Sequence, residues 1–148
     1  MAEKHLSQGG RIWLGRFALL GVVTFFVTAL ALQFVRGDYP WFRTPLSFYL
    51  IGPYSGWLHL GYFALAAAIV LIAVGCYFSS IPAARSAATL ITFGLGALGV
   101  TVTALSPTDV DGHVTRHGAV HLLAAALAFL ATSVAMLLQS WRFRQDPG

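Results

Sequence analysis

Charged side chains are scarce in this sequence, and their scarcity excludes most soluble folds. Only 9% of the 148 residues are Asp, Glu, Lys or Arg, whereas about a quarter are charged in ordinary soluble domains. Hydrophobic residues make up 57% of the chain, and its mean hydropathy is +0.75. Because a water-soluble core cannot enclose that much apolar surface, composition excludes a soluble enzyme, a nucleic-acid-binding protein and a disordered tail.

Cysteine is rare in this sequence, and acidic residues are absent from its long apolar stretches. Cys76 is the only cysteine, so the chain has neither a disulfide framework nor a metal site built from several cysteines. The long apolar stretches contain no Asp, Glu or Lys. Proton relays and acid-coupled exporters use carboxylates inside the membrane, and the sequence therefore lacks the residues on which they depend.

Four apolar stretches are each long enough to cross a bilayer as a helix, which takes about 20 residues. They cover about residues 12–35, 57–78, 87–105 and 118–140. A β-barrel would need alternating apolar and polar residues, which runs such as LAAALAFLATSVAMLL lack. The first stretch is longer than the apolar region of a usual signal peptide, so we expect it to be retained. The sequence predicts an all-α integral membrane protein, a single membrane domain over residues 1–148 that forms a four-transmembrane-helix bundle.

Basic residues in the connecting segments predict the orientation, because cytoplasmic segments carry an excess of Lys and Arg. The N-terminal region, the second loop and the C-terminal region share six basic residues: Lys4, Arg11, Arg16, Arg85, Arg142 and Arg144. The first and third loops share three: Arg36, Arg43 and Arg116. We therefore expect both termini to be cytoplasmic, an N-in/C-in topology with the first and third loops outside.

Polar side chains able to carry chemistry gather at the predicted outer ends of the helices. His59 lies near the start of the second helix and His121 one turn into the fourth, at a similar depth. His117 is four residues before His121 and shares its helical face. The candidate outer-face cluster consists of Ser47, Tyr49, His59, Asp109, His117 and His121.

Several hypotheses compete for this cluster. Its members can hydrogen-bond one another and the loops in a purely structural role, because buried polar groups need partners. His59 with His121 or His117 can instead ligate haem b between two helices. His59, His117 and His121 can also bind Zn, with an Asp as base or fourth ligand. The remaining alternative is lipid or small-molecule binding without chemistry.

Two further features make local predictions. Small residues let the third and fourth helices approach closely, and we expect this packing to be intramolecular. The small residues are Gly94, Gly96, Gly99, Ala124, Ala128, Ala131 and Ala135. We also expect Pro107 to end the third helix and Asp111 or Thr115 to cap the fourth.

Four short motifs occur in an order that resembles the uncharacterised prokaryotic membrane family catalogued as domain of unknown function 998. They are Ser47-Phe48-Tyr49-Leu50, Gly56-Trp57, Ser106-Pro107-Thr108-Asp109 and Gly118-Ala119-Val120-His121. The resemblance covers about residues 12–140. It implies a bacterial cytoplasmic (inner) membrane and points at Ser47, Asp109 and His121, but it implies no activity.

The sequence therefore predicts a small polytopic membrane protein in a non-catalytic role. We expect an accessory or structural subunit that contacts the lipid bilayer and packs in or against a membrane complex, or against itself, without nucleic acid. The alternative is a haem- or metal-binding membrane protein, either redox-active or a lipid hydrolase, that uses the outer-face cluster. A catalytic site requires a cavity open to lipid or water beside the histidines, whereas a structural cluster would be filled and fully hydrogen-bonded.

Overall fold

The structure is all-helical, and its helices follow the four predicted stretches. The computed structural model describes residues 7–110 and 112–144, in which no strand occurs. The four long helices are α1 (Gln8–Val35), α2 (Ser55–Ser79), α3 (Ala87–Leu105) and α4 (Arg116–Arg144). Each is long and apolar enough to cross a membrane, which confirms the predicted all-α fold with four membrane-spanning helices.

Side chains next to the helices account for where three of them begin and where α3 ends. Ser7 accepts a hydrogen bond from the backbone N–H of Gly10 at the start of α1, and Ser86 accepts one from Thr89 at the start of α3. Each hydroxyl satisfies a donor that the first helical turn leaves unpaired. The helix α3 ends at Leu105, two residues before Pro107, as predicted.

Thr115 caps α4, since its hydroxyl oxygen accepts a hydrogen bond from the backbone N–H of Gly118 at 3.0 Å. This confirms one of the two predicted caps. The other, Asp111, lies outside the described residues.

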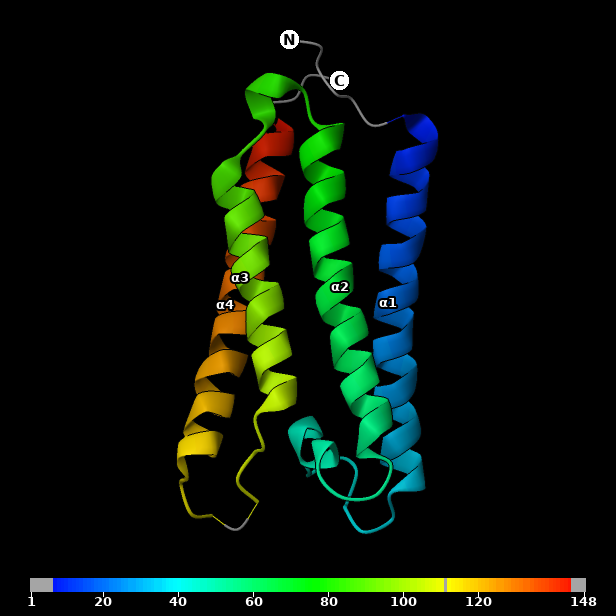
Figure 1. Ribbon diagram of the computed structural model, residues 1–148, viewed down its shortest axis with the longest axis vertical. Coiled ribbons are helices and arrows are strands. Elements are labelled where there is room, and N and C mark those ends of the chain that lie inside the picture. The colour runs from blue at the N-terminus through cyan, green and yellow to red at the C-terminus, as the bar shows by residue number, and fades with distance from the viewer. Residues whose placement is uncertain (1–6, 111, 145–148) are drawn as a thin grey trace.

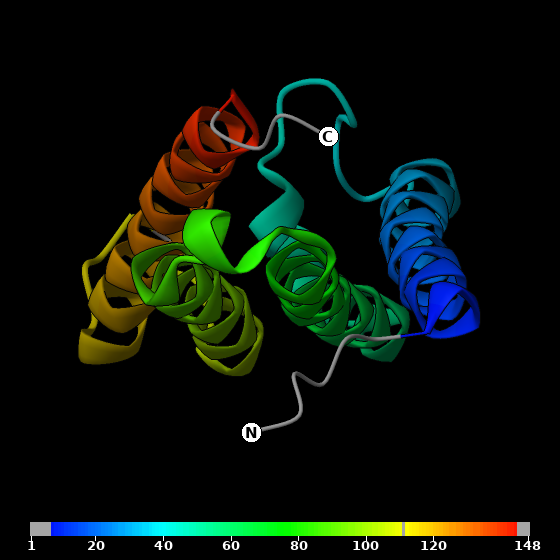
Figure 2. The ribbon, with the colours of Figure 1, turned by 90° about the horizontal axis from the view of Figure 1, so that it is seen from above.

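The helices run alternately up and down, so α1 begins and α4 ends at the same end of the molecule (Figure 1). Seen from above, they form a curved row in chain order rather than a closed square (Figure 2). Each helix packs against its neighbours in the sequence, whereas α1 and α4 form no substantial interface within the described part of the chain. The row therefore consists of two helical hairpins, α1–α2 and α3–α4, that meet at the α2–α3 interface.

Small residues bring the helices of each hairpin close together. A Cβ atom added at Gly99 would lie 2.7 Å from the backbone nitrogen of Ala128 on α4, and one added at Gly21 would lie 2.5 Å from the carbonyl oxygen of Ala64 on α2. The predicted close packing of α3 against α4 is thus confirmed. A Cβ at Gly94 would meet nothing within 4 Å, so this glycine does not contribute to it.

The connection between α1 and α2 folds back onto the end of the bundle as the short 3-10 helix η1 (Leu46–Leu50). Tyr49 is fully buried and Leu50 nearly so, in a cluster with Ala29, Leu32 and Leu58. The loop between α2 and α3, at the opposite end, contains the single-turn helix η2 (Pro82–Ala84). Burial of Tyr49 and Leu50 places Ser47, also in η1, at this end of the bundle.

Candidate functional site

A groove with a volume of about 810 Å³ opens between the α1–α2 hairpin and α4. All four helices, η1 and the α3–α4 loop contribute to its wall, which is mostly apolar. Its apolar lining residues include Phe25, Leu65, Ile69, Val100, Ala125, Phe129 and Met136. The volume falls in the range of roughly 300–1,000 Å³ that is usual for small-molecule sites.

Polar side chains lie at the end of this groove that carries η1 and the α3–α4 loop. They are Ser47 of η1, Thr108 and Asp109 of the loop, and His121 of α4. Three residues of the predicted cluster, Ser47, Asp109 and His121, therefore share one groove. We call this polar end, defined by Ser47, Thr108, Asp109 and His121, the groove mouth.

Asp109 fastens the α3–α4 loop to the first turn of α4. Its Oδ2 accepts a hydrogen bond from the backbone N–H of Thr115 at 2.9 Å, and its Oδ1 accepts one from the Thr115 hydroxyl at 2.7 Å. These two hydrogen bonds, with a smaller contribution from the charges of His117 and His121, hold the pKa of Asp109 below its usual value. The carboxylate thus stays ionised at neutral pH.

The same carboxylate explains the glycine at position 118. A Cβ atom added at Gly118 would overlap the Asp109 side chain. Only a residue without a side chain therefore lets the carboxylate lie against the first turn of α4.

His121 links the start of α4 to the end of α3. Its side chain is only 6% exposed, and its Nδ1 lies 2.8 Å from the carbonyl oxygen of Ser106. Because a carbonyl only accepts hydrogen bonds, Nδ1 carries a proton and donates it to Ser106. In the uncharged ring with this tautomer, Nε2 is an acceptor. Within residues 7–110 and 112–144, no protein group hydrogen-bonds Nε2.

Two of the sequence motifs therefore contact each other: Ser106–Asp109, which follows α3, and Gly118–His121, in the first turns of α4. His121 is hydrogen-bonded to Ser106, and Asp109 lies against Gly118. The profile of the family described as protein of unknown function DUF998 matches residues 19–148. The chain belongs to this family. No curated protein and no solved structure matches the chain, so the geometry of this DUF998 protein has to carry the functional argument.

Three residues of the predicted cluster do not line the groove. Tyr49 of η1 is buried in the apolar cluster with Ala29, Leu32 and Leu58, and its hydroxyl has no hydrogen-bond partner in the described part of the chain. Nδ1 of His59 lies 2.9 Å from the Ser55 carbonyl oxygen one turn earlier on α2 and donates to it. His117 is exposed at the start of α4.

These positions bear on the metal and haem hypotheses. In the described ranges, no group of three His, Cys, Asp or Glu side chains is placed to hold a metal ion. The three proposed Zn ligands, His59, His117 and His121, are thus not assembled in this structure. Zn binding and haem b ligation by His59 with His121 or His117 stay predictions.

Arg36 positions the loop that carries Ser47. From the sequence, Arg36 is only one of the basic residues that are counted to predict the orientation in the membrane. It is 4% exposed, and its Nη1 donates hydrogen bonds to the carbonyl oxygens of Ile51 at 2.6 Å and Pro53 at 3.2 Å. Its Nε and Nη2 pair with both oxygens of Asp38. This pairing raises the pKa of Arg36 and lowers that of Asp38. The Arg-x-Asp spacing directly after an apolar run was the available sequence signal.

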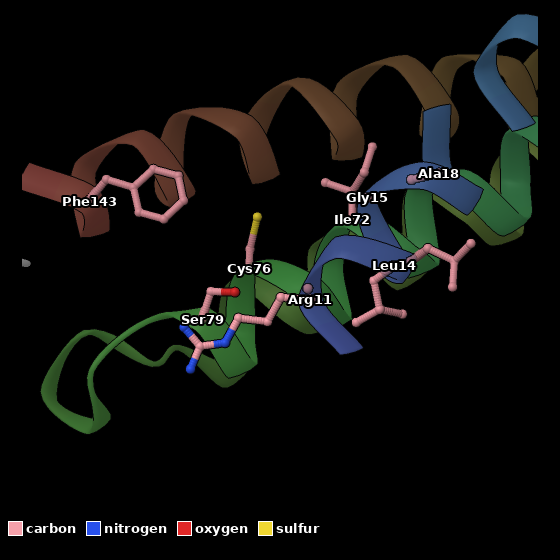
Figure 3. A pocket seen from close by; sticks show the side chains of 10 residues that line it. Arg11, Leu14, Gly15, Ala18, Ile72, Cys76, Ser79 and Phe143 are labelled. Carbon is pink, nitrogen blue, oxygen red and sulfur yellow. The ribbon is translucent and has the colours of Figure 1, made fainter. Parts of the chain in front are cut away.

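A smaller cavity of about 320 Å³ lies at the opposite end of the bundle (Figure 3). It is formed by the start of α1, the end of α2 and Phe143 of α4, and it contains the partly buried Cys76. Arg11, Cys76 and Ser79 are its polar or polarisable lining residues. None of the residues predicted for the functional site lies there.

Proposed function

We propose that this protein is a non-catalytic subunit of the bacterial cytoplasmic membrane that binds one membrane-resident partner molecule in its groove. The observation that carries the proposal is the open groove beside His121. A filled, fully hydrogen-bonded structural cluster has no such groove, whereas a binding site and a catalytic site both require one, so the polar contacts at the mouth distinguish these two. The accessory-subunit hypothesis agrees with this function. In the proposed orientation both termini are cytoplasmic, and the groove mouth faces the outer surface.

Binding fits the polar groups at the mouth better than catalysis does. Both oxygens of Asp109 accept hydrogen bonds from Thr115, and Nδ1 of His121 is engaged by Ser106. In the described part of the chain, Asp109 makes no hydrogen bond to His121, and Ser47 makes none to either residue. A nucleophile, base and orienting acid in hydrogen-bond contact, the usual arrangement for covalent catalysis, is therefore absent from this stretch of the protein.

A pair of neighbouring alanines on α4 supplies the test. Ala125 lines the groove, whereas Ala126 lies next to it on the exposed face. Protein purified in mild detergent is compared by native mass spectrometry as wild type, Ala125→Phe and Ala126→Phe. We expect a stoichiometric bound molecule on the wild type and on Ala126→Phe, reduced about tenfold on Ala125→Phe. Equal occupancy of all three proteins, or occupancy of none, would refute the proposal.

A lipid hydrolase is the second candidate, favoured by the fact that Ser47, Asp109 and His121 line the same groove. In that case Nε2 of His121 would accept the proton of a water molecule or of the Ser47 hydroxyl as it attacks an ester carbonyl. The assay is release of fatty acid from a lipid ester by wild type and Ser47→Ala. Turnover that Ser47→Ala abolishes in folded protein would favour hydrolysis, and its absence from both proteins is the outcome expected for a binding subunit.

A further inference from the structure

We infer that the groove binds an uncharged lipid whose headgroup bears hydroxyls, with this headgroup at the groove mouth and one hydrocarbon chain along α4. The inference rests on the proposed binding function and adds the chemical class of the occupant. Three properties of the groove lead to it: its length, the distribution of its polar side chains, and the charge of its lining.

The groove is elongated and runs along most of α4. From Gly118 to Met136 it follows α4 for 18 residues, about 27 Å at the helical rise. An elongated apolar groove of this length accommodates an extended hydrocarbon chain.

The ionisable side chains of the lining lie at one end of it. Asp109 and His121 lie at the mouth with Ser47 and Thr108, while Leu65, Ile69 and Phe129 belong to the mainly apolar wall farther along. The other polar side chains of the lining carry hydroxyls: Tyr62, Thr103, Thr132 and Ser133. A headgroup at the mouth keeps its hydrogen bonds, and a chain along the wall meets a mostly apolar surface.

The charge of the lining selects the headgroup. The described lining residues include no Lys or Arg, and Asp109 is held in its ionised form. A phosphate would be repelled by this carboxylate and would find no cation in the groove wall. A hydroxyl can donate to Asp109 or to Nε2 of His121 and accept from Ser47 or Thr108. The groove therefore favours an uncharged hydroxyl headgroup over an anionic one.

The test compares two lipids on delipidated full-length protein by native mass spectrometry. The probes are 1-monooleoylglycerol, which bears hydroxyls and no charge, and dioleoylphosphatidylglycerol, which bears a phosphate. We expect a saturable 1:1 adduct with monooleoylglycerol that is about tenfold more abundant than the adduct with phosphatidylglycerol. Ala125→Phe should lose the monooleoylglycerol adduct, and Ala126→Phe should keep it. Asp109→Asn should narrow the preference between the two lipids, because it removes the repelling charge.

The outcomes separate this inference from the proposed function. A groove-dependent adduct with the preference reversed, or a groove-dependent polypeptide in place of a lipid, overturns the inference and leaves the binding function standing. Adducts that Ala125→Phe does not weaken overturn both. A thermal unfolding scan of each variant in the same detergent shows that loss of an adduct is not loss of the fold.

Discussion

His121 of α4 donates a hydrogen bond from Nδ1 to the carbonyl oxygen of Ser106, 2.8 Å away at the end of α3. The ring thereby binds the two helices of one hairpin together and also lines the groove. One side chain thus combines a structural contact with a place in the candidate site, and the two roles can be separated by mutation.

Replacing His121 by Ala should destabilise the protein by about 1–3 kcal/mol, because it leaves the partly buried Ser106 carbonyl without its partner. The measurement is the unfolding midpoint of purified protein in detergent. His117→Ala is the matched control, since His117 lies one turn earlier and is exposed. Equal losses in the two variants would mean that the bond to Ser106 contributes nothing specific.

Gly118→Ala should be destabilising by about 1–3 kcal/mol, because its Cβ would overlap the Asp109 carboxylate and force it away from α4. Gly94→Ala, in α3 with open space around it, should instead stabilise by up to about 1 kcal/mol through helix propensity. The unfolding midpoints of the two variants, compared with the wild type, show whether each substitution lowers or raises the stability.

The conflict at position 118 can also be tested for its cause. In an Asp109→Ala background the added methyl group meets no carboxylate, so Gly118→Ala should cost clearly less there than in the wild type. A full, additive penalty in the double variant would show that something other than Asp109 requires the glycine.

Acidification should loosen the start of α4. Hydrogen bonds from Thr115 lower the pKa of Asp109 in the folded protein. A carboxyl with a depressed folded pKa stabilises above its unfolded value of about 3.9, and this contribution is lost as the pH falls through the lower folded value. The protection of the Thr115 and Gly118 amides against hydrogen exchange, measured relative to the intrinsic exchange rate at each pH, should therefore fall below about pH 4. Asp109→Asn should remove this dependence, and an unchanged pH profile in that variant would contradict the assignment.

Arg36→Met should destabilise the η1 segment, because the carbonyl oxygens of Ile51 and Pro53 lose their donor, at a cost of about 1–3 kcal/mol. Arg36→Lys should recover part of the loss, since an ammonium cannot reproduce the paired contact with Asp38. The exposed Arg43→Met serves as control and should change stability by less than about 0.5 kcal/mol. Hydrogen exchange over residues 46–51 in the three variants is the readout.

The membrane helices could be predicted from the sequence because bilayer thickness sets a length that an apolar run either reaches or does not. The stretch 87–105 was predicted with the bounds it has, and Pro107 follows the end of α3 as expected. The curved row could not be predicted in the same way. Lipid and protein interior are both apolar, so hydropathy does not reveal which face of a helix meets a neighbour.

Only part of the candidate site could be predicted from the sequence, because the sequence indicates the depth of a residue along a helix but not the direction of its side chain. Depth along a helix follows from residue position, which placed His59 and His121 near the same end. The direction in which each ring points depends on packing, and His59 bonds its own helix whereas His121 reaches α3. The pairing of Asp109 with Thr115 spans six residues of loop whose path the sequence alone does not define.

The curved row has a mechanical consequence. Because the two hairpins meet chiefly at α2 and α3, a small rotation at this one interface would widen or narrow the groove while each hairpin keeps its internal contacts. Such a rotation would make the α2–α3 interface a hinge, and it would change the distance between η1 and the α3–α4 loop. A molecule could then enter the groove from the side through a rotation at the α2–α3 interface, without the unfolding of any helix.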